Sequence, residues 1–354
     1  MSGVDDALDT LLLPFETRQL QWSDDAMFMR ARYGASLSQI ADERLTCVQS
    51  FKPEAEILRR AGFKVSPSIE LSSRKYSLIL MLPPRQRDEA RALFAQAISM
   101  LKPEGVVIAS AGNNEGARSL ESDLEKLCGN VNTLSKNKCR VFWSSPSEHT
   151  IDATLLSDWS TGDLSRPILN GRYISRPGIF AWDRIDIASA LLAQNLPIGL
   201  SGSAADLGAG FGFLSDALLE RCQSIVALDV YEAEHRALEL AQTNLAQYQS
   251  RLPIEYHWHD VTAGLNSKYD IIITNPPFHT QASIDRPDIG RRFITVAGQS
   301  LKPGGQLWLV ANRHLPYEQV LVDGFDSVNV VTQQQGFKII VATRSAHEIK
   351  RPRK

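Results

Sequence analysis

Two kinds of segment alternate along the C-terminal half of the chain. Short apolar runs bounded by turn residues predict buried strands at 203–207, 224–230, 255–259, 269–274 and 306–311. Longer segments with charges on one side predict helices at 213–222, 232–248 and 291–301. Because strands and helices alternate, we expect an α/β fold with a mostly parallel, doubly wound sheet and helices on both faces.

An internal repeat links the two halves of the chain. Three blocks recur in the same order at a nearly constant offset. They are YSLILMLPP (76–84) with YDIIITNPP (269–277), LKPEG (101–105) with LKPGG (301–305), and KCRVFW (138–143) with KIIVAT (338–343). We therefore expect two tandem Rossmann-like domains, residues 1–150 and 165–354, joined by a segment rich in turn residues.

A glycine-rich segment, ADLGAGFG, lies between a predicted strand and a predicted helix and contains Gly208, Gly210 and Gly212. Glycine permits a tight turn with a ligand lying against the backbone, and N–H groups at a helix start suit a polar or anionic group. The motif reads D-x-G-x-G-x-G, with Asp206 ahead of the glycines. Asp229 ends the next predicted strand, where a carboxylate can accept hydrogen bonds from both ribose hydroxyls of a nucleoside cofactor.

Two further polar residues follow predicted strands. Asp260 comes after EYHWH and Asn275 after YDIIIT, so both are expected at the carboxyl edge of the sheet, where ligands bind in open α/β folds. Asp260 could reach an adenine amino group, although an aspartate at a loop start is often only a turn residue.

The motif NPPF at 275–278 suits an amine substrate. An exocyclic amine conjugated to a ring is a poor nucleophile. Hydrogen bonds to the Asn275 side-chain oxygen and the Pro276 carbonyl would orient it and stabilise the charge that develops on nitrogen. Pro277 would stiffen the turn together with Pro276, and Phe278 offers a face on which a flipped base can stack.

These motifs together resemble class I S-adenosylmethionine-dependent methyltransferases of the amino-methylating type. Their targets are adenine N6, guanine N2 or a glutamine amide. The chain is more specifically similar to the ribosomal RNA guanine-N2 methyltransferases of the RsmC and RlmG type, which have tandem domains with one cofactor site, in the second. The segments that carry this resemblance are GIFAWDRIDIA (178–188), NPPFH (275–279) and VANRHLPY (310–317). It departs from the family pattern at Ala181, Trp182, Ala188 and Ala209.

The resemblance implies S-adenosylmethionine as cofactor and guanine N2 in 16S ribosomal RNA as target, with 23S ribosomal RNA as the alternative. The expected cofactor-binding residues are Asp206, Gly208, Gly210, Gly212, Asp229, Asp260 and Asn275. The expected catalytic residues are Asn275, Pro276, Pro277 and Phe278. The expected substrate-binding residues are Phe180, Arg172, Arg176, Arg291 and Arg292.

The first copy lacks these features. Leu82 stands where the second copy has Asn275, and the D-x-G-x-G-x-G pattern is absent. We expect this copy to be degenerate, to bind no cofactor, and to support the active domain or position RNA.

Composition narrows the classes of function further. The formal net charge of −2 gives no overall basic field, so phosphate contacts would depend on local clusters: Arg172 with Arg176, Arg291 with Arg292, and the Lys350–Lys354 tail. The four cysteines form no C-x-x-C pair, which predicts free thiols and no metal site. No apolar run approaches the ~18 residues of a membrane span, and the start is not a secretory signal. We expect a cytoplasmic monomer.

Three alternatives remain open. A protein glutamine N5-methyltransferase shares the NPP-aromatic motif, but its partner domain is typically a small helical bundle. An adenine-N6 enzyme cannot be separated by the motif alone. An RNA-binding assembly protein without activity is disfavoured because Asp206, Asp229 and Asn275 are intact.

Overall fold

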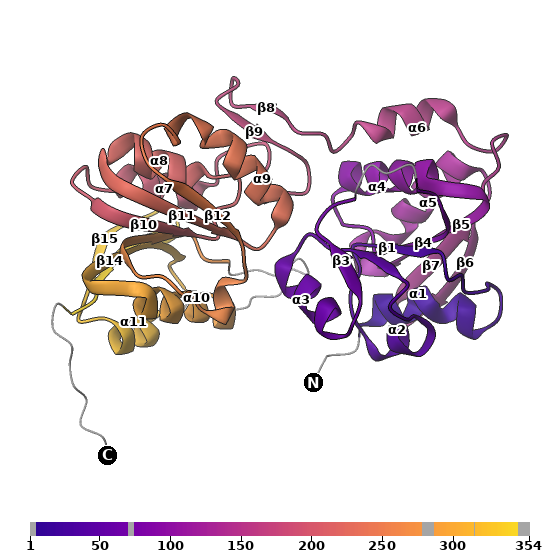
Figure 1. Ribbon diagram of the computed structural model, residues 1–354, viewed down its shortest axis with the longest axis horizontal. Coiled ribbons are helices and arrows are strands. Elements are labelled where there is room, and N and C mark those ends of the chain that lie inside the picture. The colour runs from indigo at the N-terminus through magenta and orange to yellow at the C-terminus, as the bar shows by residue number, and fades with distance from the viewer. Residues whose placement is uncertain (1–4, 70–73, 278–286, 315, 346–354) are drawn as a thin grey trace, which may run out of the picture. The chain divides into compact units, whose positions relative to one another are not determined.

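The computed structural model contains two compact units (Figure 1). The first comprises residues 1–166 and 176–178, and the second comprises residues 167–175 and 179–354. The structure describes residues 5–69, 74–277, 287–314 and 316–345. Within these residues no helix has the length and apolar character needed to cross a membrane.

The first unit is built on a seven-stranded sheet with the order β3-β2-β1-β4-β5-β7-β6. Its strands are β1 (Ala26–Met29), β2 (Thr46–Val48), β3 (Lys64–Ser66), β4 (Tyr76–Met81), β5 (Leu101–Gly112), β6 (Asn132–Lys136) and β7 (Cys139–Ser144). Its helices are α1 (Asp6–Glu16), α2 (Ala35–Ile40), α3 (Lys52–Arg60), α4 (Arg87–Met100), α5 (Ala117–Cys128) and α6 (Ala153–Ser160), with a 3-10 turn at Asn113–Glu115.

The second unit repeats this topology in a sheet with the order β12-β11-β10-β13-β14-β16-β15. Its strands are β10 (Ser201–Leu207), β11 (Ser224–Glu232), β12 (Ile254–Trp258), β13 (Tyr269–Thr274), β14 (Leu301–Asn312), β15 (Ser327–Gln334) and β16 (Phe337–Thr343). Its helices are α7 (Ile187–Asn195), α8 (Phe213–Arg221), α9 (His235–Asn244), α10 (Pro287–Ser300) and α11 (Glu318–Gly324), with 3-10 turns at Ala246–Tyr248 and Val261–Ala263. Strands β8 (Arg166–Ile168) and β9 (Tyr173–Ser175) pair in a separate two-stranded sheet.

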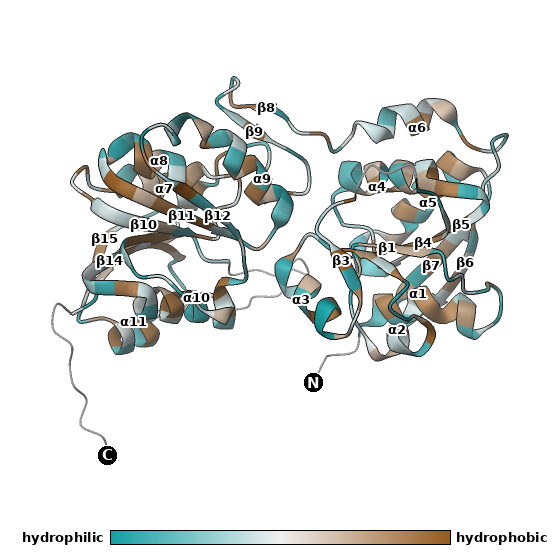
Figure 2. Ribbon diagram, in the orientation of Figure 1, coloured by the Kyte–Doolittle hydropathy of each residue, from teal (hydrophilic) through white to brown (hydrophobic). Residues whose placement is uncertain are grey.

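Both sheets are parallel except at one edge, where β5/β7 and β7/β6 pair antiparallel in the first unit, as do β14/β16 and β16/β15 in the second. The central strands of both sheets are mostly hydrophobic (Figure 2). In the second unit α7, α8 and α9 pack in one core cluster and α10 and α11 in another, one on each face of the sheet. The expected tandem doubly wound α/β fold is confirmed.

Several expected boundaries were wrong. Strand β11 runs to Glu232, two residues beyond the expected end, because Tyr231 and Glu232 still pair with His257 and Trp258 of β12. Helix α9 accordingly begins only at His235. Strand β14 begins at Leu301, so the LKPGG segment belongs to the strand and does not form a turn ahead of it.

Candidate functional site at the carboxyl edge of the second sheet

The glycine loop joins β10 to α8 and is tied to the end of β11. Gly208, Gly210 and Gly212 have φ angles of 77°, 58° and 93°, which favour glycine. The N–H groups of Gly208 and Ala209 both donate to the Tyr231 carbonyl, at 2.9 and 3.1 Å. These two loop donors are therefore used inside the protein, contrary to the expectation of open donors for a ligand.

The glycines differ in what lies beside them. A Cβ on Gly212 would lie 3.2 Å from the Cα of Ala241, so this glycine lets the loop pack against α9. A Cβ on Gly210 would meet no atom within 4 Å. The backbone at Gly210 therefore borders open space, as a ligand cradle requires.

Asp206 lies at the end of β10 and is fully buried. Its Oδ2 accepts a hydrogen bond from the Ser215 hydroxyl at 2.7 Å, whereas Oδ1 is buried with no hydrogen-bond partner. Burial raises the pKa of Asp206 to about 7, and the nearby Glu232 carboxylate adds to this rise. An unpartnered buried acceptor suits a ligand that brings a donor or a positive charge.

Asp229 does not end its strand, so the expected placement was wrong. It lies three residues before the end of β11, where its Oδ2 accepts a hydrogen bond from the Tyr269 hydroxyl and its Oδ1 lies 3.5 Å from His257 Nε2. Burial alone would raise the pKa of Asp229, but the contacts with His257 and Tyr269 outweigh it and lower the pKa. Tyr231 extends the network through a 2.6 Å contact between its hydroxyl and that of Tyr269. Asp229 therefore serves a polar network within the sheet.

Glu232 occupies the strand end that was expected for Asp229. Its Oε2 accepts a hydrogen bond from the Gly210 N–H at 2.7 Å, and its Oε1 accepts one from the Glu234 N–H at 2.8 Å. Glu232 is partly exposed, but enough protein surrounds its carboxyl group that burial raises its pKa. Glu232 is not among the expected site residues, because the predicted strand ended at Val230 and did not include Tyr231 and Glu232.

Asp260 follows β12, as expected. Its side chain caps the 3-10 turn at Val261–Ala263, and its Oδ1 accepts from the Thr262 N–H at 2.9 Å and hydroxyl at 2.7 Å. One carboxylate oxygen of Asp260 thus stabilises the turn. This agrees with the alternative raised by the sequence, in which Asp260 is a turn residue.

Asn275 directly follows β13 and is half-buried. Its Nδ2 donates to Asp186 Oδ2 at 3.0 Å and to Ser189 Oγ at 2.8 Å. Both residues belong to the start of α7, where Asp186 is the N-cap. Pro276 is buried and Pro277 exposed.

Phe278, the fourth residue of the motif, lies outside the described residues, as does the Lys350–Lys354 tail. Phe180, by contrast, is 67% exposed and remains available to stack on a base. Arg291 and Arg292 are both exposed on α10, and Arg292 Nε donates to the Thr262 carbonyl at 2.8 Å.

The other two arginines are engaged within the protein. Arg172 donates to Glu220 at 2.7 Å and to the buried Asp216 at 3.1 Å. Arg176 pairs with Asp163. Neither guanidinium is a free phosphate ligand in this structure.

The first unit fills the equivalent positions differently. Its first and fourth strands pair in the same register as β10 and β13, so Phe28 occupies the position of Asp206 and Arg30 that of Gly208. Arg30 keeps the left-handed backbone with φ 54°. Its guanidinium lies 3.0 Å from Glu89, whose side chain is 3% exposed. An apolar ring and an ion pair thus replace the acid and the glycine.

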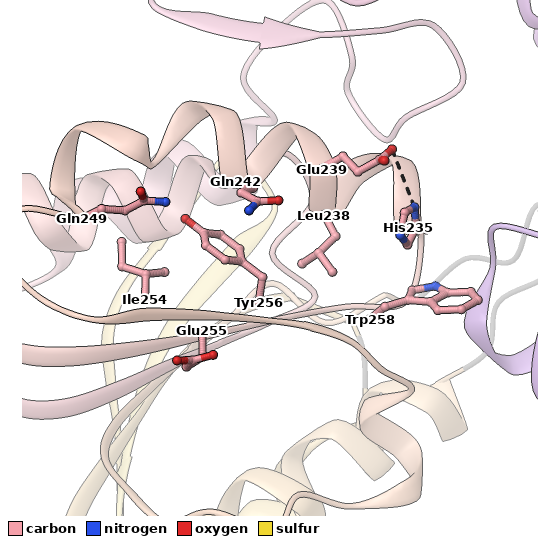
Figure 3. A pocket seen from close by; sticks show the side chains of 9 residues that line it. All are labelled: His235, Leu238, Glu239, Gln242, Gln249, Ile254, Glu255, Tyr256 and Trp258. Atoms are coloured by element: carbon pink, nitrogen blue, oxygen red, sulfur yellow. Dashed lines mark ion pairs between the residues drawn. The ribbon is translucent and has the colours of Figure 1, made fainter. Parts of the chain in front are cut away.

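A separate pocket lies on the side of α9 (Figure 3). It has a volume of about 490 Å³ and is lined by His235, Leu238, Glu239, Gln242, Gln249, Ile254, Glu255, Tyr256 and Trp258. None of the expected cofactor residues is among them. Its carboxylates, one of them paired with His235, make it unsuitable for phosphate.

Residues 170–341 match the family model of the methyltransferase small domain. The match covers most of the second unit.

Relatives match over most of the chain. The ribosomal RNA small subunit methyltransferase C of Shewanella pealeana is 29% identical over 75% of this chain and 76% of its own length. The protein of that name from Shewanella baltica is 27% identical over 93% and 90%. A solved T. thermophilus structure, a 16S rRNA N2 methyltransferase (RsmC) with AdoMet and guanosine, shares the fold with a TM-score of 0.77 and 22% identity, covering 97% of this chain and 93% of its own.

The residues at the carboxyl edge fit the expected cofactor, S-adenosylmethionine. The unpartnered Asp206 Oδ1 suits an ammonium group, and Glu232 at the strand end suits a pair of ribose hydroxyls. The space beside Gly210 lets a ligand lie against the backbone.

Proposed function

We propose that this chain methylates the exocyclic N2 of a guanine in 16S ribosomal RNA. The observation that carries the proposal is Asn275, a side-chain amide at a strand end whose N–H groups are turned into the protein, beside a glycine loop that fits the cofactor. The names of the relatives, which span most of the chain, support the RNA target. Ribosomal RNA as substrate is consistent with a cytoplasmic protein.

Five residues would hold the cofactor: Asp206, Gly208, Gly210, Glu232 and Asp260. Asp206 would bind the ammonium group, Glu232 the ribose hydroxyls, and Asp260 would lie at the adenine. In this proposal Gly212 serves packing and Asp229 serves the polar network of the sheet. The bound cofactor supplies an electrophilic methyl group on a sulfonium.

Asn275 and Pro276 would act on the substrate. The Asn275 Oδ1 and the Pro276 carbonyl accept the two N–H groups of the target amine and keep its nitrogen facing the methyl group. As nitrogen gains positive charge these acceptors stabilise it, which lowers the barrier. The extra proton then leaves to water, since a ring-conjugated alkylammonium is strongly acidic.

The first unit would bind no cofactor. Phe28 offers no acceptor where Asp206 stands in the second unit, and buried Leu82 offers none at the position of Asn275. The Arg30–Glu89 pair lies at the place of the glycine loop. We propose that this unit supports the second or positions RNA.

Transfer of labelled methyl groups tests the proposal. The full chain is incubated with labelled S-adenosylmethionine and either small-subunit or large-subunit ribosomal RNA from cells lacking the protein, and the nucleosides are separated. N2-methylguanosine from the small-subunit RNA supports the proposal. Label only in large-subunit RNA overturns the 16S assignment, and N6-methyladenosine overturns the guanine assignment. Asn275→Ala is the control for background transfer.

A further inference from the structure

Three side chains meet behind the proposed catalytic amide. Asn275 Nδ2 lies 3.0 Å from Asp186 Oδ2 and 2.8 Å from Ser189 Oγ. The same Asp186 oxygen accepts the Ser189 N–H at 2.9 Å and its hydroxyl at 3.1 Å. One carboxylate oxygen thus receives three donors from two segments that are 86 to 89 residues apart in sequence.

This arrangement determines which way the amide faces. A carboxylate oxygen only accepts hydrogen bonds, so the NH2 group of Asn275 must be the part that faces Asp186. The Ser189 hydroxyl gives its proton to Asp186 and is left to accept from Asn275. Both amide hydrogens are then used, and Oδ1 has no partner among the described residues.

We propose that Asp186 and Ser189 are positioning residues that hold Asn275 as a pure acceptor and so select an amino group as methyl acceptor. The inference rests on the proposed function. A flipped amide would present its N–H groups to the target, repelling an amine and binding a carbonyl oxygen instead. Asp186 and Ser189 thus form a clamp on Asn275, and this clamp makes the site favour the guanine amine over an oxygen of a base.

The clamp stands on a rigid element. Helix α7 buries Ala188, Leu191 and Leu192 in the core of the second unit. Asp186 is also the N-cap of this helix. A test must therefore separate loss of the clamp from loss of the cap.

Substitutions at Asp186 make that separation. Asp186→Ser keeps a good N-cap but is too short to reach Asn275, whereas Asp186→Asn keeps both the cap and an acceptor oxygen. Both variants are assayed at a temperature at which thermal melting shows them folded. We expect kcat to fall about 10- to 30-fold in Asp186→Ser and only about threefold in Asp186→Asn, because a small displacement of a catalytic group lowers the rate strongly. Ser189→Ala should lower kcat about tenfold. KM for RNA and the cofactor Kd should change less than threefold.

A double-variant cycle measures whether the effect of Ser189 on the rate depends on Asn275. A purely structural role of Ser189 in the fold would give no such dependence. In an Asn275→Ala background, Ser189→Ala should cause no further loss of rate, because no amide remains to be oriented. NMR provides a second readout. The side-chain NH2 resonances of Asn275 are identified as those that are missing in Asn275→Ala, and these resonances should shift in Ser189→Ala.

Two results would overturn the inference while leaving the proposed function intact. One is an unchanged kcat in Ser189→Ala and Asp186→Ser with Asn275→Ala impaired. The other is an equal loss from Ser189→Ala in both backgrounds. Full activity in Asn275→Ala would instead overturn the proposed mechanism, and the inference with it.

Discussion

The backbone N–H of Gly210 donates a 2.7 Å hydrogen bond to Glu232 Oε2 and so joins the glycine loop to the end of β11. Through this contact Glu232 stands at the loop, whereas Asp229, three residues earlier, points its carboxylate at Tyr269 and His257. Asp229 and Glu232 are both carboxylates near the end of the same strand, yet their surroundings differ. We base their different proposed roles on these surroundings.

The first prediction compares these two acids. Glu232→Gln keeps an acceptor for Gly210 but removes the charge that would face the ribose, so S-adenosylmethionine binding should weaken about tenfold or more. Titration calorimetry on the full chain measures this and should give one site per chain in the unsubstituted protein.

Asp229→Asn is the matched control. It removes the negative charge that accepts from Tyr269 and faces His257, so the protein should melt at a lower temperature, while the cofactor Kd should stay within about twofold. Because the contacts of Asp229 lower its pKa, its contribution to stability is present above the ordinary aspartate range and is lost as pH falls through the folded pKa. A large loss of affinity in Asp229→Asn with none in Glu232→Gln would reverse the assignment.

The second prediction concerns pH and Asp206. Its pKa is raised to about 7, so the folded protein retains a proton that the unfolded chain has lost above about pH 4. Its contribution to stability is therefore complete below the ordinary aspartate pKa and is lost as pH rises to about 7, a change on the order of 4 kcal/mol. Melting of the cofactor-free protein between pH 4 and 8 should show this loss, and Asp206→Asn should lack it. Parallel curves for the two proteins would contradict the raised pKa.

Much of the fold could be predicted from the sequence, because the structural preference of each segment agrees with the way the segment packs in the fold. Strand β13 has the expected bounds, Tyr269 to Thr274, since a β-branched run ends at an Asn-Pro turn. The repeated blocks predict the duplicated sheet because they fall on strands at equivalent places in the two sheets, β4 and β13, β5 and β14, and β7 and β16.

What the sequence did not reveal depends on contacts between distant residues. The end of β11 is set by pairing with β12, and no local feature marks Glu232 over Asp229. Asp186 and Ser189 reach Asn275 only through the packing of α7. Arg172 seemed a free cation because its partner Asp216 lies 44 residues away.

The third prediction concerns RNA contact. Arg291 and Arg292 are exposed, so changing both to Gln should weaken RNA binding and reduce the dependence of log affinity on log salt by roughly one unit per lost phosphate contact. Filter binding across a salt series measures this. Arg172→Gln is the control, because its charge is already paired with Glu220 and Asp216 and its slope should not change. The same slope in all three proteins would exclude phosphate contacts by α10.

The last prediction contrasts equivalent positions in the two units. Asn275→Ala removes the proposed acceptor and should lower the methyl-transfer rate about 10²- to 10³-fold, with cofactor affinity nearly unchanged. Leu82→Ala removes the side chain at the matching place in the first unit. Since Leu82 is 5% exposed, this change should cost about 2–5 kcal/mol of stability through the cavity it leaves, while the rate per folded molecule should persist. Single-turnover transfer and thermal melting on both variants separate the two effects. A loss of rate in folded Leu82→Ala that equals the loss in Asn275→Ala would mean that the first unit takes part in the chemistry.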